Sequence, residues 1–239
     1  MFRSVYTWSK VIDDGSNWAG SSDFSAGPGQ VKYMASHDFG LASFDVRHAF
    51  TTNFTYDLPT GDLEGVMDKV FGGWGTSGIV TIQSGTPFNV GGGAAPSWMR
   101  YVGNYPDLVT GASVQYDARN PDQYFNPAAF KLPGAPDSEP GTTNPGFVGN
   151  VARNFMIGPG TVTFNFVLQK NTSLSERVDL QFRSEFHNLF NRANFSRPAS
   201  NIFNSRASGG IHGRRSNAGE ITSTRLTSRQ IQFAIKLVF

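Results

Sequence analysis

The chain of 239 residues contains no cysteine. This absence excludes disulfide frameworks, thiolate metal sites and cysteine nucleophiles. An excess of charge of one sign is also missing, because 20 Lys and Arg residues stand against 18 Asp and Glu residues and leave a net charge of +2. A charge balance of this kind gives no electrostatic footprint for DNA or RNA, so we expect no nucleic-acid partner.

Long hydrophobic runs are scarce as well. No stretch of the sequence approaches the roughly 18 consecutive apolar residues that predict a membrane-spanning helix. Residues 1–10 lack the continuous apolar region of a secretory signal peptide. An exported protein without such a signal would be a fragment or a processed chain, and we expect this chain to be one of the two.

Phenylalanine and glycine are abundant instead, with 21 and 27 copies. Aromatic residues favour strands, and glycine marks turns and irregular loops, so the composition excludes a helical bundle. Six segments alternate between apolar and polar residues with the period of two that predicts a β-strand. These segments are residues 2–10, 47–58, 74–86, 161–171, 177–190 and 229–239.

The last of these segments has one apolar face and one largely polar face, and it stops on an aromatic residue. Such a strand can line the core of a soluble sheet, or it can face lipid while its other side faces a watery lumen. An aromatic residue at the extreme end favours the outer-membrane barrel. The apolar face carries Ile231, Phe233, Ile235, Leu237 and Phe239, and the opposite face carries Gln230, Gln232, Ala234, Lys236 and Val238.

Segment 177–190 gives the strongest indication of a lumen. Its polar face carries five polar or charged residues in succession, and its other face is rich in phenylalanine, as are those of segments 47–58 and 161–171. We expect Asp179 and Glu185 on this face to form a charge ladder with Arg177 and Arg183, in which acidic and basic side chains pair. The residues that we predict to face the lumen are Asp179, Gln181, Arg183, Glu185, His187, Gln232 and Lys236.

The links between the six segments alternate in length. Residues 172–176 form a tight turn and residues 59–73 a moderate, glycine-rich link, whereas residues 11–46, 88–160 and 191–228 are long. Bacterial barrels have short periplasmic turns and long extracellular loops. We therefore predict an all-β, antiparallel transmembrane barrel fragment of about six strands with three long extracellular loops. The Gly-, Pro-, Asn- and Ser-rich composition of these loops predicts exposed, irregular chain.

Several runs in a fixed order resemble a known family. The runs DVRHAFTTNFTYDLPTG (residues 45–61) and GGWGTSGIVTIQSGTPFNV (residues 72–90) look like the C-terminal barrel of Oar-like TonB-dependent receptors. The runs YFNPAAF (124–130), GNVARNFMIGPG (149–160), FRSEFHNLFNRANFSRP (182–198) and RQIQFAIKLVF (229–239) look like it as well. The resemblance extends over nearly the whole chain.

This resemblance implies a 22-stranded outer-membrane barrel that is filled by an N-terminal plug. A TonB complex would supply energy through a short N-terminal segment, and both that segment and the plug are absent from residues 1–239. The chain is then expected to be the C-terminal part of the barrel domain, located in the bacterial outer membrane in contact with its lipid. The resemblance also implies an assembly signal that the barrel-assembly machinery reads, with hydrophobic packing of a final strand as the other interpretation. The positions that would carry the signal are Phe233, Ile235, Leu237 and Phe239.

No arrangement of residues indicates catalysis, a cofactor or a metal. The four histidines at positions 37, 48, 187 and 212 form no short-spaced pair of the metal-ligand type. Adjacent aspartates at positions 13 and 14 are more typical of turns than of paired catalytic acids. Residues 72–75, GGWG, are not followed by the Lys-Ser/Thr of a phosphate loop. We expect no enzyme and no cofactor.

The function implied by the resemblance is active uptake or export of a bulky solute across the outer membrane, and the sequence does not identify that solute. A soluble all-β module that binds carbohydrate through loop aromatics such as Trp98, Tyr101 and Tyr105 is the alternative. A small barrel with adhesive or structural loops is a third possibility.

Overall fold

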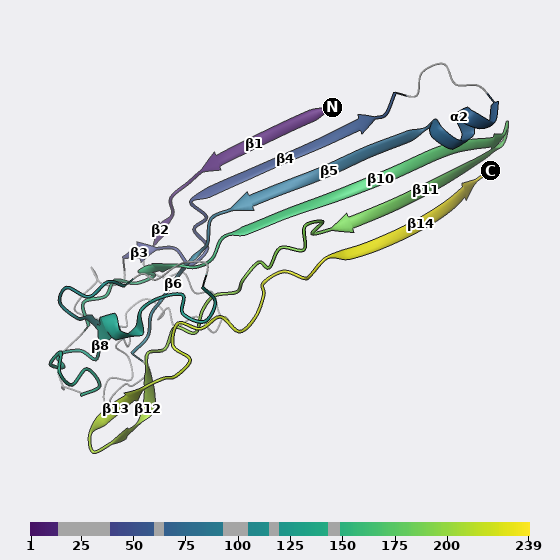
Figure 1. The fold of residues 1–239 in the computed structure, drawn as a ribbon. Coiled ribbons are helices and arrows are strands. Elements are labelled where there is room, and N and C mark those ends of the chain that lie inside the picture. Colours follow the sequence, from purple (N-terminus) through teal and green to yellow (C-terminus); the bar gives the residue numbers. More distant parts are fainter. Residues whose placement is uncertain (14–38, 60–64, 93–104, 115–119, 143–148) are drawn as a thin grey trace.

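The chain folds around one antiparallel sheet of six long strands (Figure 1). The structure is a computed structural model that describes residues 1–13, 39–59, 65–92, 105–114, 120–142 and 149–239. Each long strand pairs with the preceding and the following long strand of the chain, and the outer strands β1 and β14 leave the sheet open. The six strands are β1 (Phe2–Trp8), β4 (His48–Asp57), β5 (Trp74–Gln83), β10 (Thr161–Ser175), β11 (Val178–His187) and β14 (Gln230–Val238).

All six predicted strands are confirmed, and only their ends differ. β11 ends at His187 rather than residue 190, because Asn188 adopts φ 50° and its side-chain oxygen accepts a hydrogen bond from the Arg192 amide (3.0 Å). β10 continues to Ser175 with a bulge between Ser173 and Ser175, so the predicted turn at 172–176 is shorter than expected.

The links confirm the predicted asymmetry. The long links 9–47, 84–160 and 188–229 all leave the sheet at one end, at the lower left of Figure 1. The two short links lie at the other end, where the chain passes from β4 to β5 and from β10 to β11. Strands β4, β5, β11 and β14 have 9 or 10 residues, which is the length that a tilted strand needs to cross a bilayer.

Short elements occupy the long links. Their described residues form four small two-stranded sheets and a 3₁₀ turn that is capped by the side chain of Asn126. The short elements are β2 (Ile12–Asp13), β3 (Gly40–Leu41), β6 (Pro87–Phe88), β7 (Asp107–Leu108), η1 (Pro127–Ala129), β8 (Phe130–Lys131), β9 (Met156–Ile157), β12 (Phe203–Ser208) and β13 (Ile211–Arg214).

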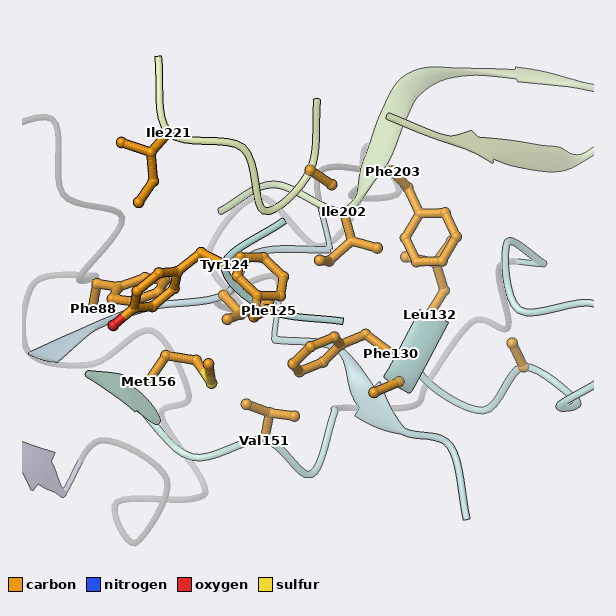
Figure 2. Packing of buried hydrophobic residues seen from close by; sticks show 14 residues of the cluster. Phe88, Tyr124, Phe125, Phe130, Leu132, Val151, Met156, Ile202, Phe203 and Ile221 are labelled. Carbon is orange, nitrogen blue, oxygen red and sulfur yellow. The ribbon is translucent and has the colours of Figure 1, made fainter. Parts of the chain in front are cut away.

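The prediction of exposed, irregular loops is wrong for much of these links, which pack into a layer with its own hydrophobic core (Figure 2). Val90 and Ala135 lie in runs that composition marked as exposed, yet both are buried. We call this assembly the loop layer. Its core consists of Phe88, Val90, Tyr124, Phe125, Ala129, Phe130, Leu132, Ala135, Val151, Met156, Ile202, Phe203, Ala218 and Ile221.

The link between β4 and β5 contains a helix, α2 (Gly65–Phe71), that the sequence pattern did not predict. The helix ends where the Gly72 amide donates to the Asp68 carbonyl (2.7 Å). Gly73 follows with φ +68° and lies so close to the Asn171 carbonyl that a side chain at this position would collide with it. Only glycine fits this junction, so the GGWG run serves a turn between a helix and a strand.

Candidate functional site

The strand registers place all apolar sides of the six strands on one face of the sheet. Leu180, Phe182 and Phe186 of β11 stand opposite Leu237, Ile235 and Ile231 of β14. The same alternation continues through the other strands, where Phe166 is opposite Phe186 and Phe164 is opposite Val80. The sheet therefore has one apolar face that extends over all six strands, as the sequence pattern predicted.

Aromatic rings cross this apolar face from strand to strand. The ring centroids of Phe54 on β4 and Phe164 on β10 are 6.4 Å apart, and the two rings meet over Gly78 of the intervening strand β5. A Cβ atom at Gly78 would lie 2.6 Å from the Phe54 ring, so glycine provides the space for this pair. Phe182 and Phe233 stack at 6.4 Å across β11 and β14. Such pairs stabilise neighbouring strands beyond simple burial.

Every buried hydrophobic residue of the described chain lies outside the six long strands. The apolar face of the sheet remains exposed instead, including Phe233, Ile235 and Tyr56. A soluble sheet must bury its apolar face against another layer. An exposed apolar face of this extent marks a surface that contacts another apolar medium.

The opposite face brings together the polar residues that the sequence singled out. Gln181 is opposite Lys236, and Glu185 is opposite Gln232. The Glu185 carboxylate lies 2.6 Å from Nε of Arg183 and 3.6 Å from Nε2 of His187. This ion-paired ladder along β11 was predicted for Arg183 and Glu185.

Asp179 does not join that ladder. Its carboxylate accepts a hydrogen bond from the Ser173 hydroxyl across the β10–β11 pair (2.7 Å). Arg177, which we expected in the same ladder, lies in the turn before β11 and not on the strand.

The loop layer is held by buried polar contacts as well as by its core. The Arg214 guanidinium lies over the Phe203 ring at 5.1 Å and donates to the carbonyl oxygens of Pro127 and Phe130. Burial lowers the pKa of Arg214 from its usual value. The Tyr124 hydroxyl donates to the Ile157 carbonyl (2.8 Å), and burial raises the pKa of this phenol. Both groups join segments that are distant in the sequence.

A hollow of about 340 Å³ lies where β5 and β10 enter the loop layer. Thr86, Gly158 and Phe195 line it together with Arg197 and Arg225. The sequence pattern did not identify the two arginines, because they lie on loop segments without periodicity. This hollow combines apolar walls with two cationic side chains.

The terminal apolar residues project from the apolar face without covering. Phe233, Ile235 and Leu237 are exposed, and the Phe239 side chain is 98% exposed. Tyr105, by contrast, is 3% exposed and cannot stack on a carbohydrate, whereas Trp98 and Tyr101 lie outside the described residues. His37 and Asp14 also lie outside the described residues.

Among the described residues, no group of three or more His, Cys, Asp or Glu side chains could hold a metal ion. No helix in the described ranges has both the length and the hydropathy to cross a membrane.

The model of one protein family matches almost the whole chain. This family is described as an outer membrane beta barrel domain, and the match covers residues 1–232. The chain belongs to this family. No curated protein and no solved structure matches the chain.

Membership of the outer membrane beta barrel domain family agrees with the antiparallel all-β architecture and indicates a location in the bacterial outer membrane. The strands of such a barrel cross the membrane with one side towards lipid. The exposed apolar face of this sheet is therefore the side that contacts lipid. The soluble carbohydrate-binding module finds no support in a sheet that buries none of its apolar face.

Proposed function

We propose that the chain supplies the C-terminal strands of an Oar-like TonB-dependent receptor that moves a bulky solute across the outer membrane by active uptake or export. One observation supports the proposal above all. All six strands expose an apolar face, and five of them are at least as long as a membrane-crossing strand, while the buried hydrophobic residues of the described ranges all lie in the loop layer at one end. The resemblance of the terminal runs to Oar-like receptors supports the finer assignment.

The open sheet supports a role as part of a larger barrel. β1 and β14 each have a free hydrogen-bonding edge in the six-stranded sheet. Unpaired backbone groups are not tolerated in lipid, and single-chain barrels begin at about eight strands. Further strands of the same receptor would pair with both edges. The N-terminal part of the receptor, which contains the plug, would engage the TonB complex.

The orientation follows from the link lengths. With the short links in the periplasm, the loop layer lies outside the cell and meets the solute first. The polar face then lines the lumen, with Asp179, Gln181, Arg183, Glu185 and His187 on β11 and with Gln232 and Lys236 on β14. These residues would contact the solute as it passes along the wall of the barrel.

A porin-like channel is the second candidate, because membership of the barrel family supports passive passage equally well. Measurements of electrical conductance distinguish the receptor from the porin-like channel. The protein purified from the outer membrane of its source cells should give no steady conductance in planar lipid bilayers, because a plug fills the lumen of a receptor. Mild urea that unfolds the plug should then open a large conductance. A steady open channel without urea would contradict the receptor and favour the porin.

The terminal residues Phe233, Ile235, Leu237 and Phe239 would form the signal that the barrel-assembly machinery reads. Phe239 makes this testable, because its exposed side chain has almost no packing to lose. Phe239→Ala should lower the amount of folded protein in the outer membrane several-fold, while Phe44→Ala, at another exposed phenylalanine outside the strands, should not. Folded protein is measured by its heat-sensitive mobility in gels. Equal yields of the two variants would leave no role for Phe239 in assembly.

A further inference from the structure

Helix α2 exposes an apolar face of its own. Val66, Met67, Val70 and Phe71 fall on one side of its two turns, and their exposed fractions lie between 50% and 76%. Asp68 and Lys69 occupy the other side, and no residue of the helix is buried. A helix that exposes four large apolar side chains is unstable in water but suits an interface between water and lipid.

Two side chains connect α2 to the apolar face of the sheet. The Trp74 indole N–H donates to the Val70 carbonyl (3.2 Å), and the Lys170 ammonium donates to the Gly72 carbonyl (2.5 Å). Lys170 also lies 5.1 Å from the centre of the Trp74 ring, and these two residues are partners in the β5–β10 register. Two residues of the apolar face therefore hold α2 at the short-link end of the sheet.

Lys170 is exceptional in its position. It is the only Lys, Arg, Asp or Glu that the alternation places on the apolar face of the six described strands. A charged amine survives there only if its end reaches the polar headgroups, as Lys side chains at membrane boundaries do. Tryptophan is enriched at the same boundary. The pair Lys170–Trp74 thus combines the two residue types that are typical of a membrane boundary.

We infer that α2, Trp74 and Lys170 form an interfacial anchor that inserts into the phospholipid leaflet on the short-link side of the barrel. The apolar side of α2 lies among the upper acyl chains, Asp68 and Lys69 face water, and the Lys170 ammonium lies at the level of the lipid phosphates. The anchor fixes the depth of β5 and β10 in the membrane. This inference rests on the proposed function, since it requires the apolar face of the sheet to contact lipid.

The absence of cysteine makes a direct test possible, because single cysteines can carry a nitroxide label without background. Met67→Cys and Lys69→Cys place labels on opposite sides of α2 in the assembled protein in phospholipid vesicles. Collisions with oxygen, which partitions into lipid, should exceed those with a water-soluble nickel chelate several-fold at position 67. The order should be reversed at position 69. Equal access of the chelate to both positions would overturn the anchor, and protection of position 67 from both reagents would mean that a protein covers α2 instead.

Labels on β5 distinguish a failure of the anchor inference from a failure of the proposed barrel. Val80→Cys should be accessible to oxygen and Thr81→Cys to the nickel chelate. If this pattern is observed while position 67 is accessible to the chelate, the apolar face of the sheet contacts lipid but α2 does not insert, and the anchor inference is wrong. If position 80 is accessible to the chelate, both proposals fail. Lys170→Met should increase access of the chelate to position 67 and leave position 80 unchanged, whereas Lys170→Arg should retain the original pattern. No change in Lys170→Met would remove Lys170 from the anchor.

Discussion

Replacement of Val80 by arginine should nearly abolish folded protein in the outer membrane. Val80 lies near the middle of β5, between Thr52 of β4 and Phe164 of β10, on the apolar face. Arginine on the lipid side of a barrel strand costs about 2–4 kcal/mol near the bilayer midplane. A penalty of that size reduces the equilibrium ratio of folded to unfolded protein by roughly 30-fold or more, since every 1.4 kcal/mol is a factor of ten.

The neighbouring residue provides a matched control. Thr81 is adjacent to Val80 on the same central strand, but its side chain belongs to the polar face, where its register partners are Thr51 and Thr163. Thr81→Arg should therefore be accepted with a near-normal yield. The free energy of unfolding in lipid vesicles, obtained by urea titration, measures both variants. Equal destabilisation by the two substitutions would contradict the assignment of lipid to the apolar face.

The strands were predictable from sequence because lipid contact imposes a strict period of two. Phe50, Phe54 and Tyr56 alternate with threonine and asparagine, and the same rhythm returns in β11 and β14. The pattern failed where lipid contact stops. Beyond Asn171 the residues of β10 are mostly polar on both faces, so apolar alternation is lost although the ladder of hydrogen bonds continues to Ser175.

The loop layer and α2 could not be predicted in the same way. Phe125, Phe130 and Ile202 are buried by contacts between distant segments, and their spacing follows neither a strand nor a helix period. Glycines at both ends and a length of only two turns conceal α2 from any window of helical length. The polar residues of β11 were predictable as one face, but the hollow with Arg197 and Arg225 depends on the tertiary fold of the loops.

Truncation of Phe125 should open the loop layer and leave the barrel intact. The Phe125 side chain is fully buried, with ring centroids 6.4 Å from Phe88 and 5.9 Å from Phe130 in an edge-on arrangement (Figure 2). Removal of a buried phenylalanine ring costs about 3–5 kcal/mol, because apolar contacts are lost and a cavity remains. None of the core residues belongs to the six long strands, so this cost is confined to the loop layer.

Proteolysis of the assembled protein measures this local opening. When opening and closing are fast, cleavage follows the population of the open state, so Phe125→Ala should accelerate cleavage within the loop layer about 100-fold or more. Phe44→Ala, at an exposed loop phenylalanine, should leave the rate near that of the unchanged protein. The heat-sensitive gel mobility of the barrel should persist in both variants. Loss of that mobility in Phe125→Ala would show that the loop layer and the sheet unfold together. In that case the loop layer could not rearrange around a solute on an unchanged barrel.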